Sequence, residues 1–291
     1  MAASGLRRLL KNDVSPPGRD GHAQDKDAKS AISSAIGATE DDVSRRPVHP
    51  GGRGFVLQQP VRLDLHNHTS FSSDGVMPPA ELLRAARANG LGCIAVTDHN
   101  TVEGALEALA LAEADPTLPR VIPGIEVSTA DGDVIGLYVQ ETIPRGLSVS
   151  DSIALIRQQG GLVYLPHPFD VIRRGTIATG VREQAADQAD VVEVLNGRSL
   201  SPLSVRNSER LAYRHAKPRG AGSDAHGPAE VGRAYVVVDR PPTREDLVAL
   251  VAAGTVAKGL QWHEYLLNWA LQPLSAMTRV RRKRGRNLSR R

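Results

Sequence analysis

Hydrophobic and polar positions divide the chain into a polar first segment and a longer segment with regular apolar patterns. Residues 1–58 are rich in Ala, Ser, Gly, Asp and Arg and contain few large apolar side chains. Such a stretch cannot bury enough apolar surface to offset its chain entropy, so we predict that it is disordered. A short partner-binding helix near residues 6–10 is an alternative.

From Val61 onward, short β-rich runs alternate with helical patterns. Strands are predicted at 61–65, 93–97, 121–127, 134–139, 162–165, 191–195 and 235–238, with 219–222 leading into a polar cluster, and helices at 79–88, 102–114, 150–159, 202–213 and 243–252. Strands that alternate with helices indicate parallel βα units and the α/β class, as a barrel or a doubly wound sheet. In both folds, ligands bind at the carboxyl ends of the strands.

The same pattern predicts a domain at 59–258, followed by a C-terminal helix and a basic tail over 259–291. Residues 262–277 are apolar at helical spacing, with one proline among them. Residues 279–291 carry eight Lys or Arg and no acid, so the rest of the chain sums to −4 within a net charge of +4. This balance excludes a uniformly basic body that coats nucleic acid. The tail is either a solvated segment or a contact for nucleic acid or an anionic surface.

The cysteine content and the lengths of the apolar runs indicate where in the cell the protein is expected. Cys93 is the only cysteine, which excludes a disulfide framework and a thiolate metal cluster. The first residues lack the pattern of a signal peptide, and no run approaches the roughly 20 apolar residues of a membrane-spanning helix. We therefore expect a cytoplasmic protein without a transmembrane segment. The oligomeric state stays open.

Imidazoles and carboxylates stand where the predicted strands end. His66 and His68 are two residues apart on one strand, so both project from the same face, and Asp224 and His226 repeat this spacing. Asp64 shares the face of His66, and we expect it to accept a hydrogen bond from a ligating imidazole.

Other candidate ligands follow later strands. His99 closes the strand at 93–97, with Asp98 as a supporting residue. Glu126 is a lone acid in an apolar strand, where burial is costly unless the charge is paired, and its two oxygens could bridge two ions. Asp74 lies in a turn sequence, and His167 stands between two prolines. Each residue alone also has a structural explanation, but the set indicates a multinuclear site.

The donor set is nitrogen and oxygen without sulfur, which suits Mn²⁺, Zn²⁺ or Fe²⁺. The chain lacks a Gly-x-Ser-x-Gly elbow, a P-loop and a Gly-x-Gly-x-x-Gly turn after a strand, so competing nucleophile and nucleotide-loop mechanisms are disfavoured.

These motifs, in this order from about Arg62 to Val238, resemble the PHP (polymerase and histidinol phosphatase) family. The resemblance implies a distorted, TIM-like (βα)7 barrel with two or three divalent metal ions at its mouth, and phosphoester hydrolysis. It implies His66, His68 and Asp224 at one ion, Glu126 bridging to a second ion with His167, and Asp74, His99 and His226 at a third. Glu126, Asp224 and His226 are then the expected catalytic residues.

Two departures from the family pattern stand out. Asp133 occupies a position where the family commonly has a histidine, so we expect it to be an altered ligand of the second ion. Pro166 follows Glu126 by only 40 residues, too few for the helical lid that some relatives insert there.

The leading function is hydrolysis of a phosphomonoester, in a nucleotide or small metabolite, by a metal-activated water. Arg173, Arg174 and Arg198 are candidate phosphate-binding residues, although each could be a surface residue. Exonucleolytic cleavage of an oligonucleotide end, in the 3′–5′ or 5′–3′ direction, is the alternative enzyme activity. A non-catalytic, metal-stabilised binding module is the alternative outside enzymes.

Overall fold

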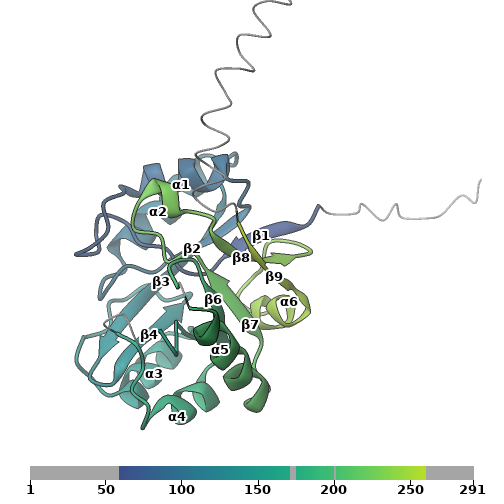
Figure 1. The fold of residues 1–291 in the computed structure, drawn as a ribbon. Helices are drawn as coiled ribbons and strands as arrows, with labels where there is room; N and C mark the ends of the chain where they lie inside the picture. Colours follow the sequence, from purple (N-terminus) through teal and green to yellow (C-terminus); the bar gives the residue numbers. More distant parts are fainter. Residues whose placement is uncertain (1–58, 171–174, 200, 260–291) are drawn as a thin grey trace, which may run out of the picture. The chain divides into compact units, whose positions relative to one another are not determined.

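The computed structural model describes residues 59–170, 175–199 and 201–259 (Figure 1). The predicted disorder of 1–58, the predicted helix and tail beyond residue 259, and the candidates Arg173 and Arg174 lie outside the described residues. Among the described residues, no helix is long and apolar enough to cross a membrane. The boundaries predicted for the three segments of the chain stay predictions.

Nine strands and six α-helices make up the described part. The strands are β1 (Val61–Asp64), β2 (Cys93–Val96), β3 (Arg120–Thr129), β4 (Gly132–Leu137), β5 (Leu162–Leu165), β6 (Val191–Asn196), β7 (Arg219–Gly222), β8 (Ala234–Val238) and β9 (Thr255–Lys258). The helices are α1 (Pro79–Ala88), α2 (Glu103–Ala114), α3 (Val149–Gln158), α4 (Arg182–Gln188), α5 (Pro202–Arg214) and α6 (Leu247–Ala253), with a short 3₁₀ helix, η1 (Pro228–Glu230).

All nine strands form one barrel-shaped sheet in the order β7-β6-β5-β4-β3-β2-β1-β8-β9. The residues after β1 close it further against β7 and the residues that follow β7. The backbone N–H of Leu65 donates to the carbonyl of Ala221 at 3.2 Å, and the N–H of Asp224 donates to that of His66 at 2.7 Å. This closure brings two ligand-rich segments, far apart in sequence, into direct contact.

The predicted α/β barrel class is confirmed, but a regular series of seven βα units is not. β4 pairs antiparallel with both β3 and β5, and β8 pairs antiparallel with both β1 and β9. Only two residues separate β3 from β4, and such a short connection permits a hairpin but no parallel crossover. The expectation of parallel units was therefore wrong at β4 and β8.

The core lies on both faces of the central strands. In β2, Cys93 and Ala95 pack in one apolar cluster, whereas Ile94 and Val96 pack in a second cluster with Leu82 of α1 and Ala105 of α2. Because strand side chains alternate between faces, a strand buried on both sides becomes a continuous apolar run. Elsewhere, α4 lies between α3 and α5 outside the sheet (Figure 1).

Element boundaries differ from the prediction where local geometry intervenes. β4 ends before the predicted residue 139, since Tyr138 adopts a left-handed φ of 59° that an extended strand cannot continue. α4 was not predicted, because its seven residues bury only Ala185 and Ala186 and show little apolar periodicity. β9 was also missed, since it is a half-exposed edge strand of four residues.

Candidate metal centre

Nine imidazole and carboxylate side chains from distant segments lie close together. Seven of them follow the ends of β1, β2, β5 and β7, and the other two, Glu126 and Asp133, lie in the β3–β4 hairpin. Nitrogen and oxygen atoms within 4.8 Å of one another define four overlapping groups. The groups are His66, His68 and Asp224; His66, Glu126 and His167; His99, Glu126 and Asp133; and His68, Asp74, His99 and His226. All nine ligands expected from the sequence belong to at least one group, and these clusters are suited to metal binding.

The first group matches the set expected for one ion. His66 Nε2 lies 3.1 Å from His68 Nε2, so the two rings face the same point, as their spacing on one strand predicted. Asp224 Oδ1 lies 3.8 Å from His66 Nε2 and 3.4 Å from His68 Nε2. Atoms that bind one ion at about 2.1 Å lie about 3.0–3.4 Å from one another, so two of these three separations match the edges of a coordination shell and the third is slightly longer.

Glu126 occupies the middle of the cluster. Its Oε2 lies 3.1 Å from His66 Nε2 and 3.2 Å from His68 Nε2, while its Oε1 lies 3.1 Å from His167 Nε2. Only 1% of its surface is exposed. Burial alone would raise the pKa of this carboxyl, but His66 and His99 outweigh burial and hold the pKa well below its usual value. The two oxygens therefore face different histidines as a charged, bridging carboxylate would.

Asp133 lies close to Glu126. The resemblance implied that it serves the second ion, with Glu126 and His167, and the structure groups its carboxylate with Glu126 and also with His99. Burial, followed by the charge of Glu126, raises the pKa of Asp133 to about 7. A second carboxylate so close to Glu126 ionises fully only when a cation offsets both charges.

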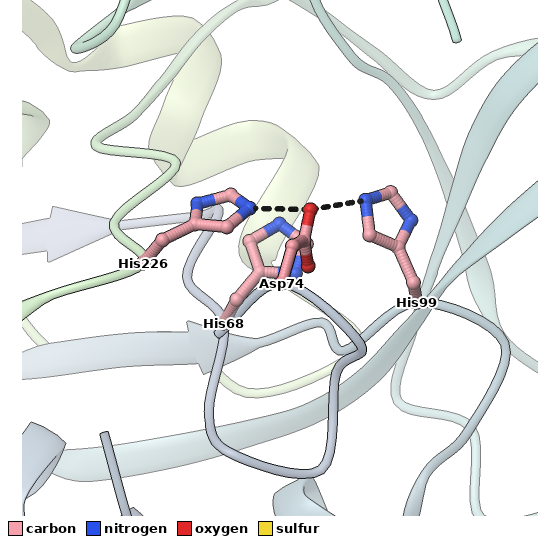
Figure 2. A group of neighbouring side chains, drawn as sticks. All are labelled: His68, Asp74, His99 and His226. Carbon is pink, nitrogen blue, oxygen red and sulfur yellow. Dashed lines mark hydrogen bonds and ion pairs between the residues drawn. The ribbon is translucent and has the colours of Figure 1, made fainter. Parts of the chain in front are cut away.

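The fourth group lies nearer the surface (Figure 2). Asp74 stands between two rings, with its Oδ2 3.0 Å from His226 Nε2 and 3.7 Å from His99 Nε2. The hydrogen bond from His226 is the main reason that the pKa of Asp74 is lowered. His68 joins this group too, with its ring centroid 4.3 Å from that of His226. The sequence placed His68 only at the first ion, so its contact with this set was missed.

Three residues in or next to the cluster have strained backbone conformations. Asn100, His167 and Asp224 adopt φ values of 58°, 26° and 51°, in the left-handed region that favours glycine. Such conformations cost about 1–3 kcal/mol each and persist where the surroundings demand them. At His167 and Asp224 the unusual backbone turns the side chain toward the cluster directly after β5 and β7.

Glu193 orients His66 and His167 through hydrogen bonds, and the sequence analysis did not predict this role. It is buried in β6, where it lies 3.3 Å from His66 Nδ1, accepts from the backbone N–H of His167 at 2.7 Å, and accepts from the Tyr164 hydroxyl at 3.0 Å. Its signal was present in the sequence, since Val191–Asn196 contains a lone acid among apolar residues, as β3 does around Glu126. It was overlooked because no motif surrounds it.

The role expected of Asp64 was wrong. Its oxygens accept from the backbone N–H of His66 at 3.3 Å and from the backbone N–H and hydroxyl of Ser223, rather than from an imidazole. Asp64 thereby fixes the backbone that carries both ligand pairs. Asp98 is a supporting residue, as expected, and accepts from the Thr69 N–H at 2.6 Å and from its hydroxyl at 2.7 Å.

The charges and free lone pairs of the cluster fit divalent cations. Burial would lower the pKa of His66, but Glu126 and Glu193 outweigh burial and raise it to about 10. Without another cation, the carboxylates thus draw a proton onto His66. His68 Nδ1 and His167 Nδ1 are buried without a hydrogen-bond partner among the described residues. A buried oxygen-and-nitrogen donor set with excess negative charge is what Mn²⁺, Zn²⁺ or Fe²⁺ requires.

Replacing Glu193 with glutamine is expected to weaken metal binding about 10- to 100-fold, because His66 loses the charged partner that orients its ring. Competition with a chelator of known affinity measures the change. Glu183→Gln, which alters an exposed glutamate that pairs with Arg214, is the matched control. Equal affinities in the two variants would contradict this role for Glu193.

A second prediction concerns pH. Burial raises the pKa of Asp64 to about 6 from an unfolded value of 3.8, so the folded chain binds more protons between these values and loses stability as pH rises through them. Asp64→Asn removes this loss. In chelator, the free energy of unfolding of the variant relative to the wild type should therefore rise by on the order of 1 kcal/mol between pH 5 and pH 7.5. A pH-independent difference in urea titrations would refute this.

Comparison with known proteins agrees with the motifs. The PHP domain model matches residues 64–184, and the PHP-associated model matches residues 202–256. An uncharacterised protein of Methanocaldococcus jannaschii is 37% identical over 146 residues, which cover 47% of this chain and 82% of that protein. A 5′-3′ exoribonuclease of Haemophilus influenzae is 35% identical over 103 residues, which cover 34% of this chain and 36% of the exoribonuclease.

A solved structure shares the fold. A two-domain protein of Bacteroides vulgatus, which contains a predicted PHP-like metal-dependent phosphoesterase, superposes with a TM-score of 0.56 at 16% identity, covering 70% of this chain and 66% of that one. At this identity the likeness shows a common fold alone. The two family models together match more than half of the chain and lead to one conclusion: this chain belongs to the PHP family.

Proposed function

We propose that this chain hydrolyses phosphomonoesters of a nucleotide or a small phosphorylated metabolite, with divalent metal ions bound in the candidate metal centre. One observation carries the proposal. The Glu126 carboxylate lies within 3.5 Å of ring nitrogens of four histidines, namely His66, His68, His99 and His167. A carboxylate shared among so many donors favours several adjacent ions over a single one.

We assign the ligands in three sets, with Glu126 as the bridge between the first two ions. His66, His68 and Asp224 would hold one ion, Glu126 and His167 a second, and Asp74, His99 and His226 a third, with Asp133 beside Glu126. Bound ions of this kind supply an activated water and offset charge on phosphoryl oxygens. In this proposal Glu126, Asp224 and His226 are the catalytic residues, because they would lie beside the activated water and the phosphoryl group.

Arg198 is the described arginine best placed to bind the phosphate. Its Nη1 lies 2.8 Å from His226 Nδ1 and 3.8 Å from Asp224 Oδ1, at the rim of the centre. Its side chain is 37% exposed, which leaves further N–H groups of the guanidinium open to solvent. A guanidinium can hold two phosphate oxygens at once, so Arg198 would fix the substrate against the cluster.

The proposal is tested with a panel of phosphomonoesters that includes nucleoside 3′,5′-bisphosphates. Protein stripped with chelator and reloaded with Mn²⁺, Zn²⁺ or Fe²⁺ should release inorganic phosphate from at least one member, and the stripped protein should not. Failure of every reloaded form to release phosphate would refute the proposal.

Exonucleolytic cleavage is the second candidate function. It is favoured by the similarity to a 5′-3′ exoribonuclease, although this chain spans only about a third of that protein. Release of mononucleotides from an oligonucleotide, in place of inorganic phosphate, would support it. The non-catalytic alternative makes a distinct prediction: His66→Ala and Asp224→Ala would then leave any observed turnover unchanged while chelator unfolds the protein.

A further inference from the structure

A groove along α1, outside the candidate metal centre, gathers positive charge from several elements. Its volume is about 1110 Å³. The cationic side chains that line it are Arg62 of β1, Arg84 of α1, Arg233 before β8, and Lys258 of β9. Glu81 is the single acidic residue among its described lining residues. We name this set the α1 groove.

The fold, rather than any local sequence pattern, assembles this charge. The four cations come from positions as distant as Arg62 and Lys258, and Arg84 and Lys258 are exposed to solvent. Like charges that converge on one groove repel one another, and an anion in the groove relieves this repulsion. The ligand expected here is therefore negatively charged.

The α1 groove also offers a planar surface. The Arg62 guanidinium lies over the Tyr235 ring, with Cζ 5.1 Å from the ring centroid. Arg62 is exposed while Tyr235 is 8% exposed, so the outer face of the guanidinium is open to a ligand. Nucleobases stack on arginine and aromatic planes without regard to sequence, which distinguishes a nucleic acid from a simple polyanion.

The size of the groove suits an extended ligand. The lining residues of α1 run from Glu81 to Ala88, which is about 10 Å of helix. The volume also lies at or above the upper end of the roughly 300–1,000 Å³ common for small-molecule pockets. More than one nucleotide unit can therefore occupy the groove.

A hydrogen-bonded carboxylate connects the α1 groove to the metal centre. Glu230 Oε1 lies 3.4 Å from Arg233 Nη1 in the groove, and its Oε2 accepts from the backbone N–H of His226 at 2.9 Å. His226 is also two residues before η1, whose Pro228 and Ala229 line the groove. The groove thus begins beside a candidate metal ligand.

We propose that the α1 groove binds a single-stranded nucleic-acid segment whose terminal phosphoester lies at the metal centre. This inference rests on the proposed function for its metal centre, and it favours the second candidate function, since it names a strand, rather than a free nucleotide, as the ligand. Arg84 and Lys258 contact strand phosphates, and the Arg62–Tyr235 pair stacks with a base.

The test compares Arg84→Glu combined with Lys258→Glu against the wild type. Binding of a 12-nucleotide single strand with phosphorothioate linkages is followed by fluorescence anisotropy at several salt concentrations. The double variant should bind about tenfold or more weakly, and the slope of log affinity against log salt should shrink by about 1.4, since two phosphate contacts are lost. The kcat/KM for a small phosphomonoester should not change.

Arg206→Glu combined with Arg210→Glu is the matched control, because both arginines are exposed on α5 and the change in charge is the same. All variants retain residues 279–291, so binding by that basic segment is common to them. An equal loss of affinity in the control, or no loss in the groove variant, overturns the proposal. If the double variant does not fold, Arg84→Gln and Lys258→Gln singly should each weaken binding about threefold.

This outcome can be separated from that of the proposed function. Strand binding that depends on the groove, without turnover of any phosphoester, refutes the enzyme activity but not the binding site. If phosphomonoesters are hydrolysed but the groove variant binds the strand as tightly as the wild type, the binding site is refuted and the enzyme activity is not. Binding of a nucleoside triphosphate in the groove without binding of the strand would also overturn the inference.

Discussion

Replacing Glu126 with glutamine is expected to lower kcat/KM for phosphoester hydrolysis by about a thousandfold, on the order of 4 kcal/mol in the activation barrier. The substitution preserves size but converts one oxygen, which lies close to either His167 or the His66 and His68 rings, into an amide nitrogen. The amide carries no charge and cannot bridge two cations through both atoms. Metal content per chain should fall with activity.

The measurement combines steady-state kinetics with metal analysis of the same preparation. Glu209→Gln, on the exposed surface of α5, is the control and should retain wild-type values. If the Glu126 variant keeps full metal content and activity within tenfold of the wild type, Glu126 is not a shared ligand. Reduced activity with full metal content would instead indicate that Glu126 acts on the substrate or water.

The second large effect is expected for Gly222→Ala at the end of β7. A β-carbon at this position would clash with the Cβ of His66, and would lie 2.9 Å from both His66 N and Glu193 Oε1. Two of these atoms belong to His66, whose carbonyl accepts a hydrogen bond from the backbone N–H of Asp224, so they cannot move away independently. We expect the free energy of unfolding to fall by about 3 kcal/mol, as in overpacked cores, and metal affinity to fall because His66 and Glu193 are displaced.

Gly227→Ala provides the comparison from the same loop. Its β-carbon would meet only the Val76 side chain at 3.9 Å, an ordinary contact, and its φ of −145° suits any residue. Urea unfolding in chelator should therefore show a loss of about 0.5 kcal/mol or less for this variant. Similar losses for the two variants would show that the close approach of β7 to β1 is not a constraint.

Part of the candidate site was predictable because strand geometry is local. His66 and His68 follow β1 with the two-residue spacing of side chains on one strand face, and their ring nitrogens lie 3.1 Å apart. Glu126 was predictable from the cost of a lone acid in an apolar strand. By the same reasoning Glu193 could have been found, but it lacked a neighbouring histidine motif to single it out.

The direction in which strands pair and the grouping of the ligands depended on the tertiary structure. The hairpin of β3 and β4 makes β4 antiparallel, and this places Asp133 near His99 and Glu126. Likewise, the role expected of Asp64 belongs to Glu193, since the residues after β7 pack against β1 and supply Ser223 as the partner of Asp64.

The sequence by itself determined the α/β class and most of the strands and helices, because periodicity acts within one element. It also identified the nine clustered side chains, from local motifs, from the cost of buried charge and, for Asp133, from the family resemblance. The tertiary structure alone decided which donors share a point in space, which carboxylate orients His66, and how Arg62, Arg84, Arg233 and Lys258 come to line one groove. These features depend on the closure of the sheet between the ends of β1 and β7 and on the antiparallel strands β4, β8 and β9. The closure joins residues far apart in the chain, and local patterns of hydrophobicity do not specify the direction in which a strand pairs.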